Sequence, residues 1–340
     1  MTDTIPILDI EPLLIAKADE RSLAHLTQKL SEAMRGIGFF YVANHGVPSD
    51  LQNRLMQSSR QFFTQPVAKK MAIAMKHAGK AWRGYFPVAG ELTSGKPDQK
   101  EGIYFGSELS GQNEAVKRGT PMHGANLWPA GTEFAQFKND VLAYMDCMTK
   151  LGQTLMAGIA LSLGLPRHYF VQRFTTDPTT LFRIFNYPKH IWEQNADEWG
   201  VREHTDMGFL TILLQDESGG LQAKAKDGRW IEAPPIKDTF VINIGDMLEV
   251  WTRGIFRATP HRVRNQAPAD RISLPFFFDP NWNASLKPIE RELLPSQFIP
   301  ASFGEDRLWD GVNLAKLRPD MTYGDFVWAK VRAVFPALSD

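Results

Sequence analysis

The chain has 340 residues, of which 43% are hydrophobic and 22% are charged. These values are typical of globular proteins, so the composition excludes a disordered chain and predicts one large domain with a sizeable core. The 38 basic and 38 acidic side chains balance, which gives no overall attraction to nucleic acid or anionic lipid and favours a small-molecule partner. Cys147 is the only cysteine, which excludes an internal disulfide and any cysteine-based metal cluster built from this chain. We therefore expect a protein of the reducing cytoplasm.

The N-terminal stretch MTDTIPILDIEPLL carries acidic residues and no basic segment before a long apolar run. It therefore predicts neither a secretory signal nor a transit peptide. No segment of the sequence reaches the length that crosses a membrane. We expect a monomer or weak homo-oligomer that has no membrane or nucleic-acid partner.

The first part of the chain alternates between strand and helix patterns. Residues 5–10 predict a short strand, and residues 19–35 predict a helix with apolar side chains on one face. The apolar segment 39–48 predicts a strand that closes in a turn, and a second helix is expected over residues 50–63. This order of elements predicts an N-terminal α/β region.

The pattern changes twice in the rest of the chain. Residues 69–127 are rich in Gly, Lys and Pro, and we expect a long ordered loop over residues 83–106, a kind of loop that commonly carries function. Helical periodicity over residues 133–163 predicts a helix that backs the core. From residue 180 on, short β-rich runs between turn signals predict a sandwich or barrel. A helical segment from about residue 307 is expected to pack over it.

Three side chains form a candidate metal site. His204 and Asp206 are separated by one residue, so on an extended strand they project from the same face. His261 lies in a later β-rich run and is the candidate third ligand of a triad with two histidines and one carboxylate. Such a triad is typical of non-haem iron(II), and it leaves adjacent coordination positions open for substrate and dioxygen. His45, in the segment NHG, is interpreted as a turn residue.

A candidate carboxylate site follows the third ligand. Arg271 and Ser273 lie two positions apart in RISLPFFFDP, so a strand places both side chains on one face. A guanidinium can hold a carboxylate with two hydrogen bonds and the hydroxyl can add a third, which suits the distal carboxylate of 2-oxoglutarate. Tyr187, in NYP, is a further candidate for this carboxylate through its phenol.

The order of these motifs resembles the isopenicillin N synthase-like branch of the iron(II)- and 2-oxoglutarate-dependent oxygenases. The resemblance covers nearly the whole chain, and the ordered set is highly specific. It rests on IPILDI, GFFYVANHGVP, NYP, HTDMGFLTILLQD, GGLQ, INIGD, HRV and RISLPFFFDP. The sequence departs from the plant pattern at Phe185, where many members carry an asparagine two residues before the tyrosine that contacts the co-substrate. The contact that this asparagine makes in those members is therefore not expected here.

The resemblance implies a mainly β fold with flanking helices, in which a distorted double-stranded β-helix, or jelly roll, follows an N-terminal α/β region. It divides the chain into an N-terminal non-haem dioxygenase region (1–130), a backing helix region (131–179), a catalytic core with the iron site (180–300) and a C-terminal helical segment (301–340). It also implies that the arginine, serine and tyrosine named above hold 2-oxoglutarate.

For the activity, the resemblance implies an iron(II) dioxygenase that couples the decarboxylation of 2-oxoglutarate to succinate and carbon dioxide with oxidation of a small organic substrate by dioxygen. Hydroxylation is the expected outcome, with desaturation, ring closure or ethylene formation as alternatives, and ascorbate is an expected stimulant. No catalytic residue beyond the metal ligands is predicted, because the protein contributes positioning and a dry pocket. Candidates for substrate contact are Arg83, Tyr85, Tyr104, Arg183, Phe278 and Trp282.

Three other functions stay open from the sequence. The first is an iron oxidase of the isopenicillin N synthase or aminocyclopropane-carboxylate oxidase type, which keeps the triad and the R-x-S motif but does not use 2-oxoglutarate. The second is a non-catalytic barrel that binds a ligand, and the third is a zinc hydrolase with the same three ligands. Oxygen consumption without 2-oxoglutarate would identify the first, and a lack of iron binding would favour the second.

Overall fold

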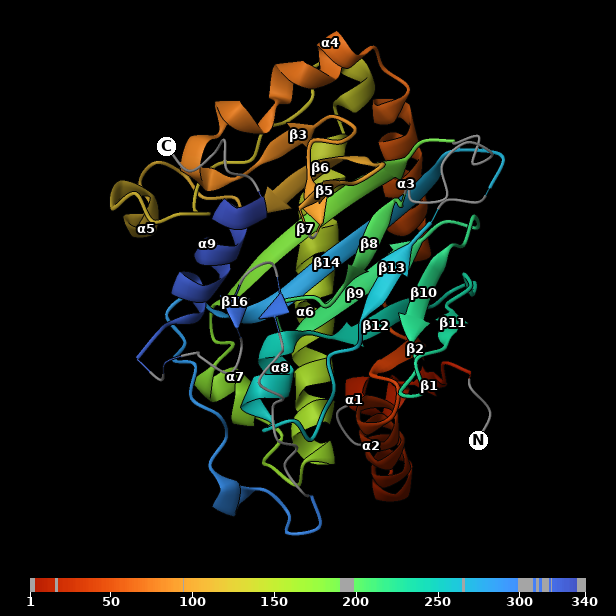
Figure 1. Ribbon diagram of the computed structural model, residues 1–340, viewed down its shortest axis with the longest axis vertical. Coiled ribbons are helices and arrows are strands. Elements are labelled where there is room, and N and C mark those ends of the chain that lie inside the picture. Colours follow the sequence, from red (N-terminus) through yellow and green to blue (C-terminus); the bar gives the residue numbers. More distant parts are fainter. Residues whose placement is uncertain are drawn as a thin grey trace.

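Two β-sheets that face each other form the centre of the molecule (Figure 1). The structure is a computed structural model and describes residues 4–15, 18–93, 95–189, 199–264, 267–298, 308–309, 312–313, 318 and 320–334. In this part of the chain the large sheet has eight strands, in the order β1 (Ile7–Asp9), β2 (Phe39–Ala43), β12 (Phe240–Ile244), β9 (Leu210–Gln215), β14 (Arg271–Asn281), β7 (Pro178–Tyr187), β6 (Glu101–Gly106) and β3 (Gly84–Phe86).

The second sheet is smaller and carries part of the candidate metal site. Within the described residues it has four strands, in the order β11 (Trp230–Glu232), β10 (Leu221–Lys224), β13 (His261–Val263) and β8 (Val201–His204). Among the described residues, two short antiparallel pairs are not hydrogen-bonded to either sheet, namely β4 (Leu92–Thr93) with β5 (Lys96–Pro97) and β15 (Leu308–Trp309) with β16 (Val312–Asn313).

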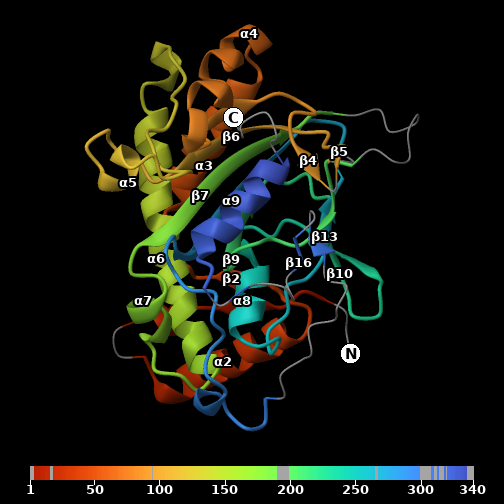
Figure 2. The same cartoon turned by 60° about the vertical axis from the view of Figure 1, so that its left-hand side comes forward.

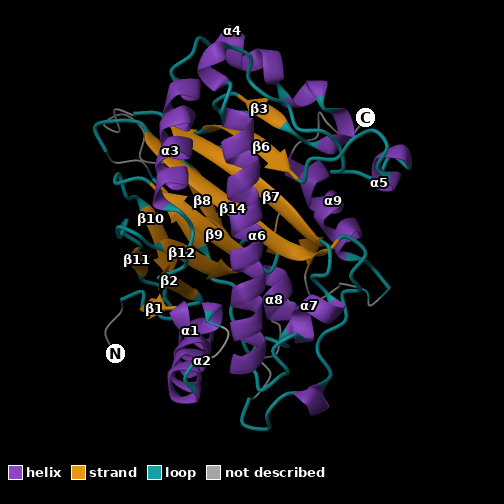
Figure 3. Ribbon diagram, turned by 180° about the vertical axis from the view of Figure 1, so that it is seen from behind, coloured by secondary structure: helices purple, strands orange, loops and turns teal. Residues whose placement is uncertain are grey.

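Helices cover the face of the large sheet that points away from the small one, and α6 and α3 lie across that face (Figure 3). The α-helices are α1 (Glu11–Leu14), α2 (Glu20–Arg35), α3 (Ser49–Phe63), α4 (Val67–Lys70), α5 (Glu114–Lys117), α6 (Phe137–Ser162), α7 (Tyr169–Arg173), α8 (Asp246–Trp251) and α9 (Tyr323–Val334). Short 3₁₀ turns are η1 (Met71–Ile73), η2 (Met75–His77), η3 (Gly79–Ala81), η4 (Thr132–Phe134) and η5 (Arg291–Leu293). No helix in the described ranges combines the length and the apolar character needed to cross a membrane.

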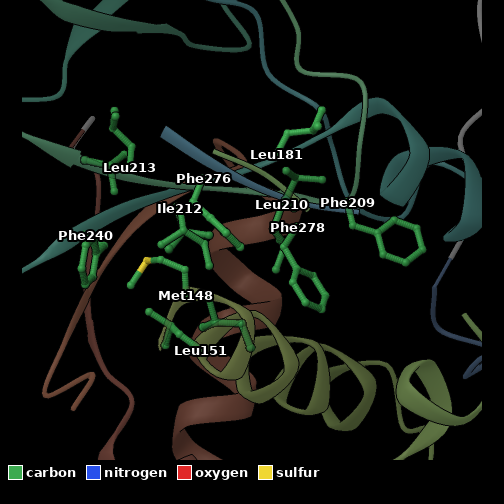
Figure 4. Close-up of a cluster of buried hydrophobic side chains, with 14 of the residues drawn as sticks. Met148, Leu151, Leu181, Phe209, Leu210, Ile212, Leu213, Phe240, Phe276 and Phe278 are labelled. Atoms are coloured by element: carbon green, nitrogen blue, oxygen red, sulfur yellow. The ribbon is translucent and has the colours of Figure 1, made fainter. Parts of the chain in front are cut away.

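The main core lies between α6 and the large sheet. Met148 and Leu151 of α6 lie close to Ile212 of β9 and Phe278 of β14 (Figure 4). Gly152 allows the close approach, because a Cβ atom there would lie 2.3 Å from Cδ2 of Phe278. Since successive strand residues point to opposite faces, the neighbours of these core residues on β9 and β14 point between the two sheets. The core therefore fixes the strands that carry the site.

The helices expected over residues 19–35, 50–63 and 133–163 are confirmed as α2, α3 and α6. The side chain of Asp19 caps the first of them by accepting a 2.9 Å hydrogen bond from the Ser22 backbone N–H. The expected N-terminal strands are also confirmed. β1 pairs with β2 in parallel, and β2 pairs with β12 of the large sheet.

The long loop expected over residues 83–106 is wrong. This segment contains β3 and β6, and β6 pairs with β7 from Glu101 opposite Asn186 to Gly106 opposite Leu181. All six residues of β6 are buried, so the strand lacks the alternation that marks a half-buried strand in a sequence. α8 differs from expectation for a similar reason: all of its residues are buried, which hides the helical period in what reads as a β-rich run.

The expected C-terminal helix is confirmed by α9, which lies along the large sheet near β7 and β14 (Figure 2). Its first residue, Tyr323, donates a 2.6 Å hydrogen bond to Oδ2 of Asp279 in β14. The backbone N–H of Phe209 donates to the other oxygen of Asp279 at 3.0 Å. Burial raises the pKa of this carboxyl to about 7. The rest of the expected helical segment lies largely outside the described residues.

Candidate metal centre and substrate pocket

The three predicted metal ligands come together between the two sheets. His204 ends β8 and His261 begins β13, and the two residues are direct partners in the antiparallel pairing. Asp206 follows β8 by two residues, and its Oδ1 atom lies 3.6 Å from Nε2 of His204 and 3.7 Å from Nε2 of His261. One ligand atom from each residue therefore lies within 4.8 Å of the other two. An ion that bound all three would join the small sheet to the loop that follows β8.

Hydrogen bonds to backbone oxygens orient both imidazole rings. Nδ1 of His204 lies 2.8 Å from the carbonyl oxygen of Arg202, and Nδ1 of His261 lies 3.0 Å from that of Thr259. A carbonyl can only accept a hydrogen bond, so each Nδ1 carries the proton and each Nε2 keeps a lone pair for a metal. Burial lowers the pKa of His204 to about 3, so its imidazole is neutral at physiological pH, as metal binding requires.

Side chains from the large sheet hold the carboxylate ligand. Asn243 of β12 donates a 2.7 Å hydrogen bond to Oδ2 of Asp206, and the Thr211 hydroxyl of β9 donates to the same oxygen. Oδ1 is thereby left facing the two histidines. Burial by itself would raise the pKa of Asp206, but the two histidines and these hydrogen bonds lower it. Two imidazoles that each present Nε2 and one ionised carboxylate fit a non-haem iron(II) centre.

The residues of the predicted carboxylate site also come together, at the point where β7 ends and β14 begins. Arg271 lies opposite Tyr187 in the pairing, with its guanidinium carbon 4.8 Å from the centre of the tyrosine ring. Ser273 follows two positions later on the same face and is buried. The guanidinium donates through Nε to the Gly219 carbonyl at 2.6 Å and through Nη2 to Gln215 Oε1 at 3.3 Å.

The fit of this site to an acid rests on one atom. Arg271 is 1% exposed, and its Nη1 has no hydrogen-bond partner among the described residues. A buried donor of a charged group is costly to leave without an acceptor, by about 1–3 kcal/mol. A ligand carboxylate would satisfy it, and the buried hydroxyl of Ser273 lies on the same face.

A cavity adjoins the candidate metal ligands, and His204 and Asp206 form part of its wall. The rest of the wall comes from the β3–β6 segment, from β7 and β14, and from Val331 of α9. Phe185, the residue that departs from the plant pattern, lines the cavity with its ring 4.9 Å from Nζ of Lys100. The position that carries an amide in many members of the family here presents an apolar face.

Of the six predicted substrate-contact residues, one lines this cavity and a second packs against that residue. Arg183 of β7 lines it directly. Tyr104 of β6 lies directly behind the wall, where its ring packs 4.2 Å from the Arg183 guanidinium carbon and its hydroxyl donates to Glu91. Burial raises the pKa of Tyr104 well above its ordinary value, so the phenol stays neutral.

The other four predicted contacts are not part of the cavity wall. Arg83 is buried and donates to the carbonyl oxygens of residues 81, 82 and 122, so it braces a turn. Tyr85 donates to Glu101 in a buried ion-pair cluster. Trp282 packs against His123 and α9. Phe278 points to α6, as described above, and the expectation that it contacts substrate is wrong.

Sequence reasoning missed Phe277, which does line the cavity. Counting in twos from Arg271 and Ser273 would have found it, because β14 pairs without interruption with β9 over this stretch and residue 277 shares their face. Trp82, Glu91 and Lys100 were also missed. Glu91 and Lys100 lie in the segment that was expected to be a loop and Trp82 directly precedes it, so no strand register was available to place them.

Family comparisons cover most of the chain. The family described as "non-haem dioxygenase in morphine synthesis N-terminal" matches residues 5–131. The family described as "2OG-Fe(II) oxygenase superfamily" matches residues 169–280. These two matches fall on the α/β opening and on the strands that carry both candidate sites.

Three curated relatives match over most of their length. A protein of Dictyostelium discoideum named "probable iron/ascorbate oxidoreductase" is 44% identical, over 99% of this chain and 96% of its own. A 1-aminocyclopropane-1-carboxylate oxidase of Dictyostelium mucoroides is 35% identical, over 98% and 96%. A homoarginine-6-hydroxylase of rice, Oryza sativa subsp. japonica, is 38% identical, over 84% and 88%.

Solved structures share the fold. A full-length protein of Neurospora crassa, solved in complex with alpha-KG and 5-formyluracil, superposes with a TM-score of 0.76 at 25% identity, over 97% of this chain and 96% of that one. Together with the family matches, this likeness confirms the mainly β fold and its double-stranded β-helix.

Proposed function

Because the chain belongs to the 2OG-Fe(II) oxygenase superfamily and is an iron(II)- and 2-oxoglutarate-dependent oxygenase, we propose that His204, Asp206 and His261 are its iron ligands. The observation that carries this assignment is the convergence of one carboxylate oxygen and two unprotonated imidazole nitrogens within 4.8 Å. The hydrogen bonds from Asn243 and Thr211 keep the carboxylate in its ligating orientation.

Arg271, Ser273 and Tyr187 are proposed to hold the distal carboxylate of 2-oxoglutarate. The unpartnered Nη1 atom of Arg271 supports this role, because it is a buried donor of a charged group without an acceptor among the described residues. Gln215 and the Gly219 carbonyl fix the guanidinium through its other nitrogens. Arg271 therefore loses little conformational entropy when the acid binds.

When bound, iron(II) and 2-oxoglutarate supply the oxidising chemistry, which consumes dioxygen, releases succinate and carbon dioxide, and oxidises a carbon atom of the substrate. The side chains of this chain provide position and exclude water. Trp82, Phe185 and Phe277 line the cavity with aromatic rings, which keeps bulk water from the reacting centre. No residue beyond the metal ligands is assigned a catalytic role.

We propose hydroxylation of a small organic molecule as the outcome, which the rice homoarginine-6-hydroxylase supports. The balanced charge of the chain and its single cysteine support a cytoplasmic enzyme without a membrane or nucleic-acid partner, acting as a monomer or weak homo-oligomer. The similarity to the Dictyostelium mucoroides oxidase favours one alternative, an iron oxidase that binds a substrate carboxylate at Arg271 in place of 2-oxoglutarate.

Succinate formation tests the proposal. Protein loaded anaerobically with iron(II) is given 2-oxoglutarate and oxygen, with and without ascorbate, and is compared with Asp206→Ala and with the matched control Asp227→Ala. Asp227 is an exposed aspartate of a surface turn that pairs with Arg229, so its loss should have no effect. Iron-dependent succinate in the wild type and in D227A but not in D206A supports the proposal.

Full turnover by folded D206A would refute the triad. Substrate-linked oxygen consumption that persists without 2-oxoglutarate would establish the oxidase alternative.

A further inference from the structure

Four charged side chains form a row, and three of them, Lys100, Glu91 and Arg183, line the substrate cavity. Nζ of the buried Lys100 lies 2.5 Å from Oδ2 of Asp98 and 2.8 Å from Oε2 of Glu91. Oε1 of Glu91 lies 3.6 Å from Nη1 of Arg183. The signs therefore alternate, negative and positive, from Asp98 through Lys100 and Glu91 to Arg183. The four formal charges of the row sum to zero.

The inner three members of the row already have close partners. Asp98 accepts from the Thr93 hydroxyl at 2.8 Å as well as from Lys100. Lys100 is shared between two carboxylates, and Glu91 accepts from the Tyr104 hydroxyl in addition to its ion pair with Lys100. Oδ1 of Asp98 and Oε2 of Glu91 make no hydrogen bond with a described residue, but the shared Lys100 neutralises both carboxylates, so these ion pairs hold the row in place.

Arg183 differs from the other three. Its guanidinium makes no hydrogen bond with any residue that the structure describes, and its Nε is buried without a partner. Its nearest acid, Glu91, is 3.6 Å away, beyond ordinary hydrogen-bond distance. The side chain is only 12% exposed. A nearly buried arginine with unused donors needs an acceptor, and the cavity is where one can enter.

Aromatic rings fix the direction of these donors. The guanidinium carbon of Arg183 lies 4.2 Å from the ring centre of Tyr104, 4.7 Å from that of Phe277 and 5.0 Å from that of Trp82. Packing on the faces of a guanidinium leaves its edge, which carries the N–H groups, as the part open to a ligand. A planar edge with parallel donors matches a carboxylate.

We propose that Arg183 binds a carboxylate of the primary substrate, and that the substrates of this enzyme are small organic acids, amino acids among them. The proposal rests on the proposed function, because His204 and Asp206 line the same cavity. A carboxylate bound to Arg183 would place a negative charge next to the positive end of the row. Oε2 of Glu91 makes no hydrogen bond within the described part of the chain, but it lies 2.8 Å from Nζ of Lys100, which already neutralises this carboxylate. Beyond Arg183 much of the wall is apolar, with Leu92, Met207 and Val331, which suits the carbon body of such an acid.

The test compares acids with their amides. Phenylacetate, hexanoate, L-leucine and L-arginine, each paired with its primary amide, are screened for stimulation of succinate formation by the wild type. Every stimulating compound is then titrated by calorimetry into anaerobic enzyme loaded with iron(II) and 2-oxoglutarate, where no turnover occurs. The variants are Arg183→Met, Arg183→Lys and the matched control Arg173→Met, which removes an exposed arginine stacked 4.4 Å over Tyr169.

The expected result is that acids bind roughly 10- to 100-fold more tightly than their amides, as a charge-assisted pair predicts. R183M should lose this preference, R183K should keep part of it, and R173M should behave as wild type. The proposal is overturned if an amide stimulates and binds as well as its acid, or if folded R183K and R183M both keep the full preference.

Failure of the proposed function would look different. In that case the wild type itself would show no iron-dependent decarboxylation of 2-oxoglutarate. A wild type that forms succinate and binds 2-oxoglutarate, yet does not distinguish acids from amides, would overturn only the role of Arg183.

Discussion

Replacing Arg271 with leucine removes the proposed anchor for 2-oxoglutarate. The lost contact is a fork of charge-assisted hydrogen bonds in a site that is 1% exposed, worth about 3 kcal/mol. That free energy corresponds to a rise of roughly 100-fold in the dissociation constant of 2-oxoglutarate. Arg271→Lys keeps the charge but loses the fork, so an intermediate rise is expected.

The substitution also leaves the Gly219 carbonyl and Gln215 without the donor they now have, which should destabilise the fold by about 1–3 kcal/mol. The matched control is Arg291→Leu, because Arg291 likewise donates to backbone carbonyl oxygens but lies outside both candidate sites. Anaerobic calorimetry of 2-oxoglutarate with iron-loaded protein measures the effect. A folded R271L whose affinity stays within about 3-fold of wild type would place the carboxylate site elsewhere.

Two further substitutions test the supports of the metal ligands and of the C-terminal helix. Asn243→Ala removes the 2.7 Å hydrogen bond to Asp206 and should weaken iron(II) binding roughly 10- to 100-fold. Competition with a chelator measures the iron affinity. An unchanged affinity would show that this hydrogen bond does not orient Asp206. Asp279→Asn tests the raised pKa of about 7. Because the folded pKa lies above the unfolded one, near 3.9, the wild type loses stability as pH rises from about 4 to 7. The asparagine variant should lack that loss, which is at most about 4 kcal/mol. Urea unfolding at several pH values measures the free energy of unfolding of both proteins. The same change with pH in both would contradict the raised pKa.

The sequence could group the candidate carboxylate residues because Arg271 and Ser273 lie on one strand, β14, where an R-x-S pattern places both side chains on one face. The H-x-D pattern does not act in this way, since β8 ends at His204 and Asp206 lies in the following loop, where Asn243 and Thr211 orient it. The third ligand, His261, came from the order of motifs rather than from geometry. The structure supplies the reason that it meets His204, since the two are direct partners across β8 and β13.

The substrate cavity was harder to predict because Glu91 and Lys100 lie directly beside short strands that show no half-buried pattern. All six residues of β6 are buried and the preceding β4–β5 hairpin has two-residue strands, so neither shows a period in the sequence. The ion pairs of Lys100 with Glu91 and Asp98 could not be inferred either, because a buried lysine looks like a surface lysine until its partners are placed. Phe277 is the exception, since the strand register counted from Arg271 was enough.

The two arginines of the site allow a last prediction, because they share no contact. Arg271 touches Gly219, Gln215 and Tyr187. Arg183 touches Glu91 and the rings of Tyr104, Phe277 and Trp82. Substitutions at sites without shared partners usually add to within about 0.5 kcal/mol, or roughly 2-fold in affinity.

The double variant R183M/R271L should therefore bind 2-oxoglutarate as weakly as R271L alone, and bind the substrate acid as weakly as R183M alone. Calorimetry of each ligand with the four proteins of the cycle measures both. If R271L instead weakens the binding of the substrate acid while R183M does not, the acid occupies the Arg271 site. The chain would then act as the oxidase that needs no 2-oxoglutarate, and the role of Arg183 would fall with that of Arg271.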